Sequence, residues 1–374
     1  MTYFAKPEFS EIDYIYNTTI RRVNFMAELT YHEQESQQAT IKLRELQKQL
    51  PAFLIEYFRG IEYSNAPRTR IAYAIDLKTF FEYLHDNNSS LKNVDIHDIP
   101  FEVLNQIKSY DIEEYLEYLK LYKKDGKTYT NNERAIKRKL SALRSMYNYY
   151  HKNKRINENP VLQVNMPKLH DKAIVRLEAN EVADLLDTVE SGRGMTAKQL
   201  EVHDKLKVRD LAILTLLLGT GIRISECVGL DVGDVDFDNT RIKIVRKGGY
   251  EAYVYFGDEV TEALGEYMIE RKAKTPVEGH ENALFLSNRN SRITVRNVEI
   301  MVKKYAKIVT PLKKITPHKL RSTYGTSLYQ ETGDIYLVAD VLGHHDVNTT
   351  KKHYAAIEEN RRMSARNKVK LREK

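Results

Sequence analysis

DLAILTLLLGTGIRISECVGL, residues 210–230, contains the longest apolar run of the chain and a glycine turn at residues 219–221. The apolar run is too short to span a bilayer, so we expect a buried helix. The Gly-Thr-Gly turn ends that helix, and RISECVGL, residues 223–230, predicts a second one. The stretch therefore predicts the helical core of a globular domain, with Arg223 at the start of the second helix.

A β-hairpin is predicted downstream of this helix pair. RIKIV, residues 241–245, and EAYVYF, residues 251–256, are rich in β-branched and aromatic residues, and RKGGY separates them. The Gly-Gly pair at residues 248–249 forms the predicted turn, which leaves Lys247 at the hairpin tip. We expect one small sheet in an otherwise helical domain.

An all-helical bundle is predicted earlier in the chain. RTRIAYAIDLKTFFEYLHDN, DIEEYLEYLKLY and IKRKLSALRSMYNYYHKN each repeat apolar residues at helical spacing. In the third segment Ile136, Leu140, Leu143 and Tyr147 form one stripe, and the lysines and arginines are expected on the other faces. This bundle therefore has one strongly basic helix.

The fold class is predicted to be mainly α with a small β-sheet, an α+β arrangement in two domains. MPKLHDKAIVRL breaks the helical periodicity with a proline and is typical of a linker. Beyond the hairpin the chain is predicted to be helical, with a first clear start at Thr316-Pro317. The expected regions are an N-terminal helical extension of unknown role (1–50), the helical domain (51–165), the linker (166–177), the mixed domain (178–360) and a basic tail (361–374).

The composition is that of a soluble globular protein, since 42% of its 374 residues are hydrophobic and 30% are charged. The single cysteine, Cys227, excludes an internal disulfide and argues against a cysteine-based zinc site. That usage suits a reducing cytoplasm, and the first residues, MTYFAKPEFSEIDYIY, lack the pattern of a secretory signal. We expect a cytoplasmic protein without a membrane partner.

Positive charge is clustered along the chain, whose net charge is +7. Residues 131–160 carry eight Lys or Arg against two Glu, and residues 361–374 carry seven against one. Such clusters are typical of proteins that bind a polyanion, although a merely solvated basic helix explains either segment alone.

Four dispersed motifs carry residues suited to phosphate chemistry. TPHKLRS places a histidine and an arginine three residues apart at a helix start, where free N–H groups and the helix dipole favour phosphate. Taken singly, GTGIRISE describes a surface arginine, RKGGY an exposed lysine, TPHKLRS a capping histidine and LGHHDVNTTKKHY a buried aromatic. In chain order the residues are Arg223, Lys247, His318, Arg321, His344 and Tyr354.

This order resembles that of the tyrosine recombinase (integrase) family, which includes the Xer recombinases and phage integrases. GTGIRISECVGL, HKLRSTYGTSLY and LGHHDVNTTKKHY look like its three signature blocks. Upstream, TRIAYAIDLKTFFEYL and RKLSALRSMYNYYHKNKRINENP look like its helical core-binding domain. The resemblance covers residues 51–361 and implies a core-binding domain and a catalytic domain that close on DNA as a C-shaped clamp.

Two positions depart from the family pattern. Ser322 stands where many relatives have a second histidine, which leaves the main roles untouched. Tyr354 lies ten residues after His344, whereas nine is common, and His353 occupies the nine-residue position. Tyr354 is the only tyrosine after Tyr336, and a histidine does not readily replace tyrosine in this chemistry. Tyr354 is therefore the expected nucleophile.

The resemblance implies a site-specific recombinase that cuts and rejoins DNA through a covalent 3′-phosphotyrosine. A phenol with a pKa of about 10 needs help to attack at neutral pH. Arg223 and Arg321 would offer planar donor forks to the phosphate oxygens. Glu226, three residues after Arg223, either holds that guanidinium or makes a plain surface ion pair.

Three further groups complete the implied site. Lys247 would protonate the leaving 5′ oxygen, and two nearby arginines would help to lower its pKa. His318 would accept the phenolic proton or contact the phosphate, and His344 would donate a hydrogen bond to a phosphate oxygen. His345 is expected to be a surface or capping residue.

No cofactor is expected. The histidines lack metal-ligand spacing and an accompanying carboxylate cluster, so we expect no metal. The phosphotyrosine conserves the energy of the broken bond, and the sequence has no P-loop, so ATP is not required.

The expected partner is double-stranded DNA. Strand exchange between two duplexes implies a tetramer on two DNA sites, and in the related recombinases the end of the chain packs against a neighbouring protomer. The need for accessory proteins stays open. The groove-facing and phosphate-binding residues are predicted on the basic helix, at Arg134, Lys137, Arg138, Lys139 and Arg144.

Other functions remain open at this point. A type IB topoisomerase uses similar chemistry and relaxes supercoils as a monomer. A catalytically inactive DNA-binding protein on the same fold, or a phosphate-ester hydrolase that uses His318 and His344, are more distant alternatives. The target DNA sequence, and the choice between chromosome-dimer resolution and mobile-element integration or excision, are not predicted.

Overall fold

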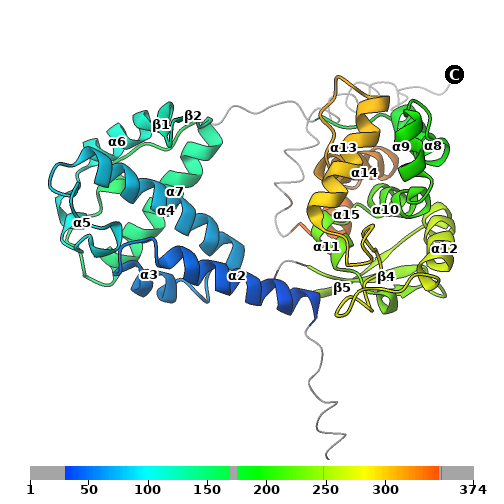
Figure 1. Ribbon diagram of the computed structural model, residues 1–374, viewed down its shortest axis with the longest axis horizontal. Helices are drawn as coiled ribbons and strands as arrows, with labels where there is room; N and C mark the ends of the chain where they lie inside the picture. Colours follow the sequence, from blue (N-terminus) through cyan, green and yellow to red (C-terminus); the bar gives the residue numbers. More distant parts are fainter. Residues whose placement is uncertain (1–29, 169–174, 247, 345–346, 348–374) are drawn as a thin grey trace, which may run out of the picture. The chain divides into compact units, whose positions relative to one another are not determined.

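The computed structural model describes residues 30–168, 175–246, 248–344 and 347 (Figure 1). The chain divides into two compact units between residues 171 and 172. The first unit is mainly helical, and the second combines helices with a three-stranded sheet, as predicted. Within the described ranges, no helix is long and apolar enough to cross a membrane.

The helical unit is built around one aromatic-rich core. Phe80 and Phe81 on one helix pack edge-on, and Phe80 also meets the ring of Tyr115. Tyr147 and Tyr150 are fully buried from a second helix. Its elements are α2 (Tyr31–Gln47), α3 (Leu54–Gly60), α4 (Pro67–Asn87), η1 (Ile96–Asp98), α5 (Val103–Gln106), α6 (Ser109–Tyr118), β1 (Tyr122–Lys124), β2 (Lys127–Tyr129), α7 (Glu133–Lys152) and η2 (Pro160–Leu162).

The β1–β2 hairpin corrects the prediction of helices throughout this unit. Strands β1 and β2 pair in antiparallel register from Tyr122↔Tyr129 to Lys124↔Lys127. Asp125 and Gly126 form the turn at φ 50° and 71°. An Asp-Gly pair tolerates these positive φ values and favours a two-residue hairpin, so the local turn overrides the apolar spacing of the preceding segment.

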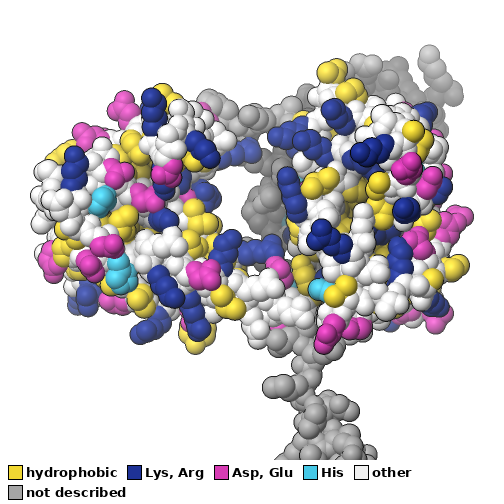
Figure 2. Space-filling view, viewed as in Figure 1, with side chains coloured by type: hydrophobic (Ala, Val, Ile, Leu, Met, Phe, Trp, Pro, Cys, Tyr) yellow, Lys and Arg dark blue, Asp and Glu magenta, His cyan; other side chains and the backbone are white. Residues whose placement is uncertain are grey.

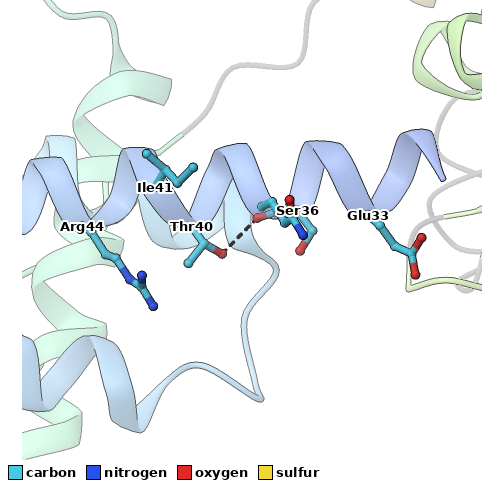
Figure 3. Close-up of a pocket in the computed structure, with 6 residues that line it drawn as sticks. Glu33, Ser36, Thr40, Ile41 and Arg44 are labelled. Carbon is cyan, nitrogen blue, oxygen red and sulfur yellow. Dashed lines mark hydrogen bonds between the residues drawn. The ribbon is translucent and has the colours of Figure 1, made fainter. Parts of the chain in front are cut away.

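Helix α2 gives part of the N-terminal extension a definite structure. Thr30 and Glu33 form a capping box at its start. Leu43 is buried, as is Leu50 just beyond the helix, and α2 packs against α4. Figure 3 shows side chains of α2 that line a shallow surface depression, where Thr40 Oγ1 donates to the Ser36 carbonyl. Residues 31–50 thus contribute to the helical unit's core.

Helix α7 carries the predicted basic face, but one of its cations points inward. Lys139 is 6% exposed, and its Nζ lies 3.1 Å from Oδ1 of the buried Asp76. Arg138 Nη1 lies 2.6 Å from the other carboxylate oxygen. Burial raises the pKa of Asp76, while the two cations act against that rise. The expectation of an outer position is therefore wrong for Lys139, because a buried carboxylate on α4 provides its charge partner.

We expect Asp76→Ala to lower the free energy of unfolding by about 3–5 kcal/mol, because it leaves a buried ammonium group without its charge partner. The measurement is the urea unfolding of the helical unit within the full chain. Asp86→Ala, on the exposed part of the same helix, is the control and should change little. A double replacement, Asp76→Leu with Lys139→Met, should recover most of the loss. An Asp76→Ala protein as stable as the Asp86→Ala control contradicts this account.

The second unit is built around helix α10 and contains a three-stranded antiparallel sheet of order β3-β4-β5. Helix α10 is buried along most of its length and packs against α8, α12 and α14. The elements are α8 (Ala179–Ser191), α9 (Ala197–His203), α10 (Lys207–Thr220), α11 (Ile224–Gly229), η3 (Val232–Asp234), β3 (Val235–Asp236), β4 (Arg241–Val245), β5 (Glu251–Tyr255), α12 (Asp258–Lys272), α13 (Val295–Val309), α14 (Pro317–Thr332) and α15 (Ile335–Leu342).

Three predicted features of this unit are confirmed. The apolar helix ends at Gly221 and the next begins after Arg223. Strands β4 and β5 form the predicted hairpin, and α14 starts at Thr316-Pro317. The prediction of helix beyond the hairpin is wrong for residues 273–294, which are irregular with two isolated β-bridges. Helices α10, α11, α14 and α15 and the β4–β5 hairpin together position the candidate residues.

Candidate active site

Arg321 lies one turn into α14 and is 5% exposed. Its Nη1 donates to the Gly221 carbonyl at 2.6 Å, and its Nη2 donates to the Leu342 carbonyl. Both acceptors stand at helix C-termini, where carbonyl groups lack partners within the helix and carry partial negative charge. Arg321 therefore joins the end of α10 to the end of α15.

Arg223 is held by Glu226 at the start of α11. The Glu226 carboxylate accepts from the Arg223 backbone N–H at 2.7 Å and from Nη1 at 2.8 Å. Glu226 is 5% exposed, so this is not a plain surface ion pair. The remaining Nη2 of Arg223 donates to the Gly343 carbonyl at 3.2 Å. One edge of the guanidinium is fixed by a carboxylate, and the other faces the end of α15.

The two predicted arginines thus meet at consecutive carbonyl groups, those of Leu342 and Gly343. They come from positions almost one hundred residues apart in the chain, and the end of α15 brings them together. Each guanidinium is a permanent cation with donors in a planar fork. Side by side, they form a preorganised pair of donors suited to a phosphate group.

Of the predicted site histidines, the structure describes His318, on α14, and His344, just after α15. His344 is half-buried and directly follows Gly343, and its backbone N–H donates to the Ala339 carbonyl at 2.8 Å. His318 is exposed in the first turn of α14, one turn before Arg321. Lys247 and Tyr354, and also His345 and His353, lie outside the described residues.

Arg246 is a residue that the sequence analysis did not identify. It follows β4 directly, and its Nη2 donates to the Val341 carbonyl at 3.0 Å. A third arginine therefore reaches the end of α15. An arginine beside a hairpin tip is usually a solvent-facing residue, and the only signal of another role was its place next to Lys247.

The predicted DNA-binding residues on α7 take different positions. Arg134 and Arg138 are exposed, and Lys137 is half-buried. Arg144 Nη2 donates to the Val161 carbonyl at 3.3 Å and to the Val164 carbonyl at 3.1 Å, so it supports the segment after the helix. Together with the inward Lys139, this leaves the N-terminal half of α7 as the outward basic surface. Figure 2 also shows Lys and Arg side chains on the visible face around α13 in the second unit.

No metal-ligating cluster of three or more His, Cys, Asp or Glu occurs among the residues that the structure describes. Cys227 is fully buried, and burial raises the pKa of its thiol. A raised thiol pKa disfavours the thiolate that nucleophilic or metal-binding cysteines require.

Comparisons with known proteins identify the family of this chain. The model of the phage integrase family matches residues 175–361, and that of the phage integrase N-terminal SAM-like domain matches residues 54–154. The tyrosine recombinase XerC of Caldanaerobacter subterraneus is 31% identical over 328 residues, 85% of each chain. The tyrosine recombinase XerS of Streptococcus mutans is 31% identical over 335 residues, 83% of this chain and 93% of the relative.

Solved structures share the fold. The XerH recombinase in a post-cleavage complex with a palindromic difH substrate has a TM-score of 0.60 at 21% identity, over 79% of this chain and 78% of that one. The Tn1549 transposon integrase in complex with a circular intermediate DNA has a TM-score of 0.59 at 20% identity, over 82% and 98% of the two chains. The predicted order of a helical core-binding domain and a catalytic domain is confirmed.

Proposed function

This chain belongs to the phage integrase family of tyrosine recombinases and acts site-specifically on DNA, and from that premise we propose how its residues cut and rejoin a strand. The Tyr354 phenol oxygen attacks a DNA phosphorus and loses its proton as the bond to the 5′ oxygen breaks. The phosphate becomes a 3′-phosphotyrosine, and the departing oxygen leaves as a 5′-hydroxyl. A 5′-hydroxyl from another strand reverses the same step, so the number of phosphodiester bonds is conserved.

The observation that carries this proposal is the convergence of Arg223 and Arg321 on the end of α15. Negative charge develops on the non-bridging oxygens as the phosphorus is attacked. A phosphate at this place can draw donors from both forks, in competition with carbonyl oxygens that carry only partial charge. Glu226 keeps Arg223 oriented before DNA arrives, which reduces the reorganisation needed in the transition state.

Proton transfer is assigned to the remaining residues. Lys247 protonates the leaving 5′ oxygen, and His318 accepts the phenolic proton. His344 donates a hydrogen bond to a phosphate oxygen. His318 lies on α14 with Arg321, and His344 directly follows Gly343, whose carbonyl accepts from Arg223, which supports their assignment to the same site.

DNA recognition is assigned to both domains. The outward cations of α7, namely Arg134, Lys137 and Arg138, would bind phosphates or base edges from the core-binding domain. The catalytic domain would bind the same duplex, so that the two domains close around it as a clamp. Footprinting the protein on DNA that flanks its gene would locate the bound site.

Covalent trapping tests the proposed reaction. A suicide substrate nicked near the cleavage position loses a short fragment after cleavage, so religation is prevented. The protein should form an adduct that survives denaturant, and the modified peptide should contain Tyr354. An adduct on another residue would show that the nucleophile assignment is wrong.

We also propose that four protomers assemble on two DNA sites, that the free protein is monomeric, and that residues 361–374 contribute the contact between protomers. Deleting this segment should preserve single-site binding, with a shallower salt dependence if its cations contact phosphates. Cooperative pairing of sites and strand exchange should fail. Gel-shift titration on one-site and two-site DNA measures both effects, and a truncated protein that recombines at the full rate would show that the tail is dispensable.

A further inference from the structure

Arg246 has a fixed backbone at the base of the hairpin turn. Its N–H donates to the Tyr250 carbonyl at 2.7 Å, and its carbonyl accepts from Gly249 N–H at 3.0 Å. The first bond continues the β4–β5 pairing for one step beyond Val245↔Glu251, and the second closes the turn between residues 246 and 249. The side chain therefore leaves from a rigid point of the sheet rather than from a loose loop.

The guanidinium of Arg246 packs against a glycine that makes room for it. A Cβ built on Gly343 would lie 1.3 Å from Nη1 and 2.4 Å from Cζ, so any other residue there would displace this guanidinium. Gly343 ends α15 at φ +60°, a conformation that also favours glycine. Both the close contact with Arg246 and the backbone conformation therefore favour glycine at this position.

Arginines from three elements share the C-terminal carbonyl groups of α15. Arg246, from the end of β4, donates to Val341, and its Nη1 lies 3.5 Å from the Asp340 carbonyl oxygen. The next two carbonyls accept from the arginine pair described above. Since a helix C-terminus carries partial negative charge, it holds the three cations close together without a carboxylate for each. Arg246 thus links the hairpin to the helix end that orients the phosphate-binding pair.

We propose that Arg246 is a positioning residue for strand cleavage. By anchoring the hairpin to the end of α15, it sets how far the next residue, Lys247, can reach. The inference rests on the proposed role of Lys247 as the acid for the 5′ oxygen. General acids work only within hydrogen-bond distance of the atom they protonate, and a displacement of about 1 Å can cost about a hundredfold in rate. Anchoring β4 at Arg246 limits that displacement.

The test compares cleavage rates on the suicide substrate at saturating DNA. Arg246→Ala should slow cleavage by about 10- to 100-fold. The double variant Arg246→Ala/Lys247→Ala should be no slower than Lys247→Ala alone, because a positioning residue has no effect once the positioned group is gone. Multiplicative losses in the double variant would overturn the inference. This comparison holds whatever chemical role Lys247 has.

A substrate with sulfur at the 5′-bridging position gives a second, separate result. The thiolate leaves without a proton, so this substrate should restore the rates of both Arg246→Ala and Lys247→Ala. If Lys247→Ala is not restored, Lys247 is not the acid and the proposed function needs correction. If Lys247→Ala is restored and Arg246→Ala is not, Arg246 acts elsewhere and the inference is wrong.

Matched variants separate positioning from charge loss and misfolding. Lys243→Ala removes one positive charge from the same strand, and its ammonium faces Glu251, so its cleavage rate should match the unmodified protein. Arg246→Lys keeps the charge and should recover only part of the rate, because lysine lacks the planar fork. DNA affinity and its salt dependence should stay unchanged in Arg246→Ala. A salt slope reduced by about one would identify a direct phosphate contact instead.

Discussion

Tyr354→Phe is expected to abolish the covalent protein–DNA adduct while leaving DNA affinity nearly unchanged. The replacement removes one oxygen atom, the atom that forms the bond to phosphorus, and retains the ring. No other group in the proposed site can form a stable 3′-phosphodiester link. The measurement is a denaturing gel with the cleaved strand labelled at its 5′ end, because the upstream fragment stays on the protein.

Two controls define this result. Tyr336→Phe changes a tyrosine that is 72% exposed on α15 and should form the adduct at the full rate. His353→Ala tests the position nine residues after His344 and should also retain the adduct. An adduct that persists in Tyr354→Phe would assign the nucleophile to another residue. If the unmodified protein forms none, the chain is an inactive DNA-binding protein, and relaxation of supercoils without recombination would indicate topoisomerase-like activity.

Arg321→Ala is expected to slow cleavage by roughly two or more orders of magnitude, the usual scale for losing a preorganised donor to a transition-state oxygen. The same change leaves the Gly221 and Leu342 carbonyls without their partner. Unfolding free energy should therefore fall by about 1–3 kcal/mol. Single-turnover cleavage and chemical denaturation measure the two losses separately.

Arg223→Ala should slow cleavage to a similar extent and destabilise the protein less, because its side chain is 35% exposed. Arg321→Lys keeps the charge and should remain strongly impaired, since an ammonium group cannot serve two acceptors in a fixed plane. Arg193→Ala, which removes an exposed guanidinium from the same domain, is the control. Full activity in Arg321→Ala would remove this arginine from the site.

Local patterns predicted much of the fold. The Gly-Gly turn between two β-rich segments specified the β4–β5 hairpin, and Thr316-Pro317 specified the start of α14. Each of these features depends on residues close together in the chain. The β1–β2 hairpin was equally local, but its Asp-Gly turn was outweighed by the apolar spacing before it.

Features that depend on residues far apart in the chain were harder to predict from the sequence. The inward position of Lys139 follows from Asp76, which lies 63 residues earlier on another helix. The contacts of Arg246 are with backbone carbonyls 94 and 95 residues away, and no side-chain pattern marks a carbonyl group. The order of arginine, lysine, histidine and tyrosine gave the candidate residues, but not how the arginines are held.

The use of carbonyl acceptors at the end of α15 has a consequence for how this site can change over generations. A carbonyl oxygen is present whatever side chain its residue carries, so exchanges at Asp340 or Val341 leave the acceptors in place. Inserting or deleting one residue in α15 would instead rotate the terminal carbonyls by about 100° and shift them by about 1.5 Å. The helix length therefore sets where these acceptors lie, and evolution should constrain that length more tightly than the side chains of α15.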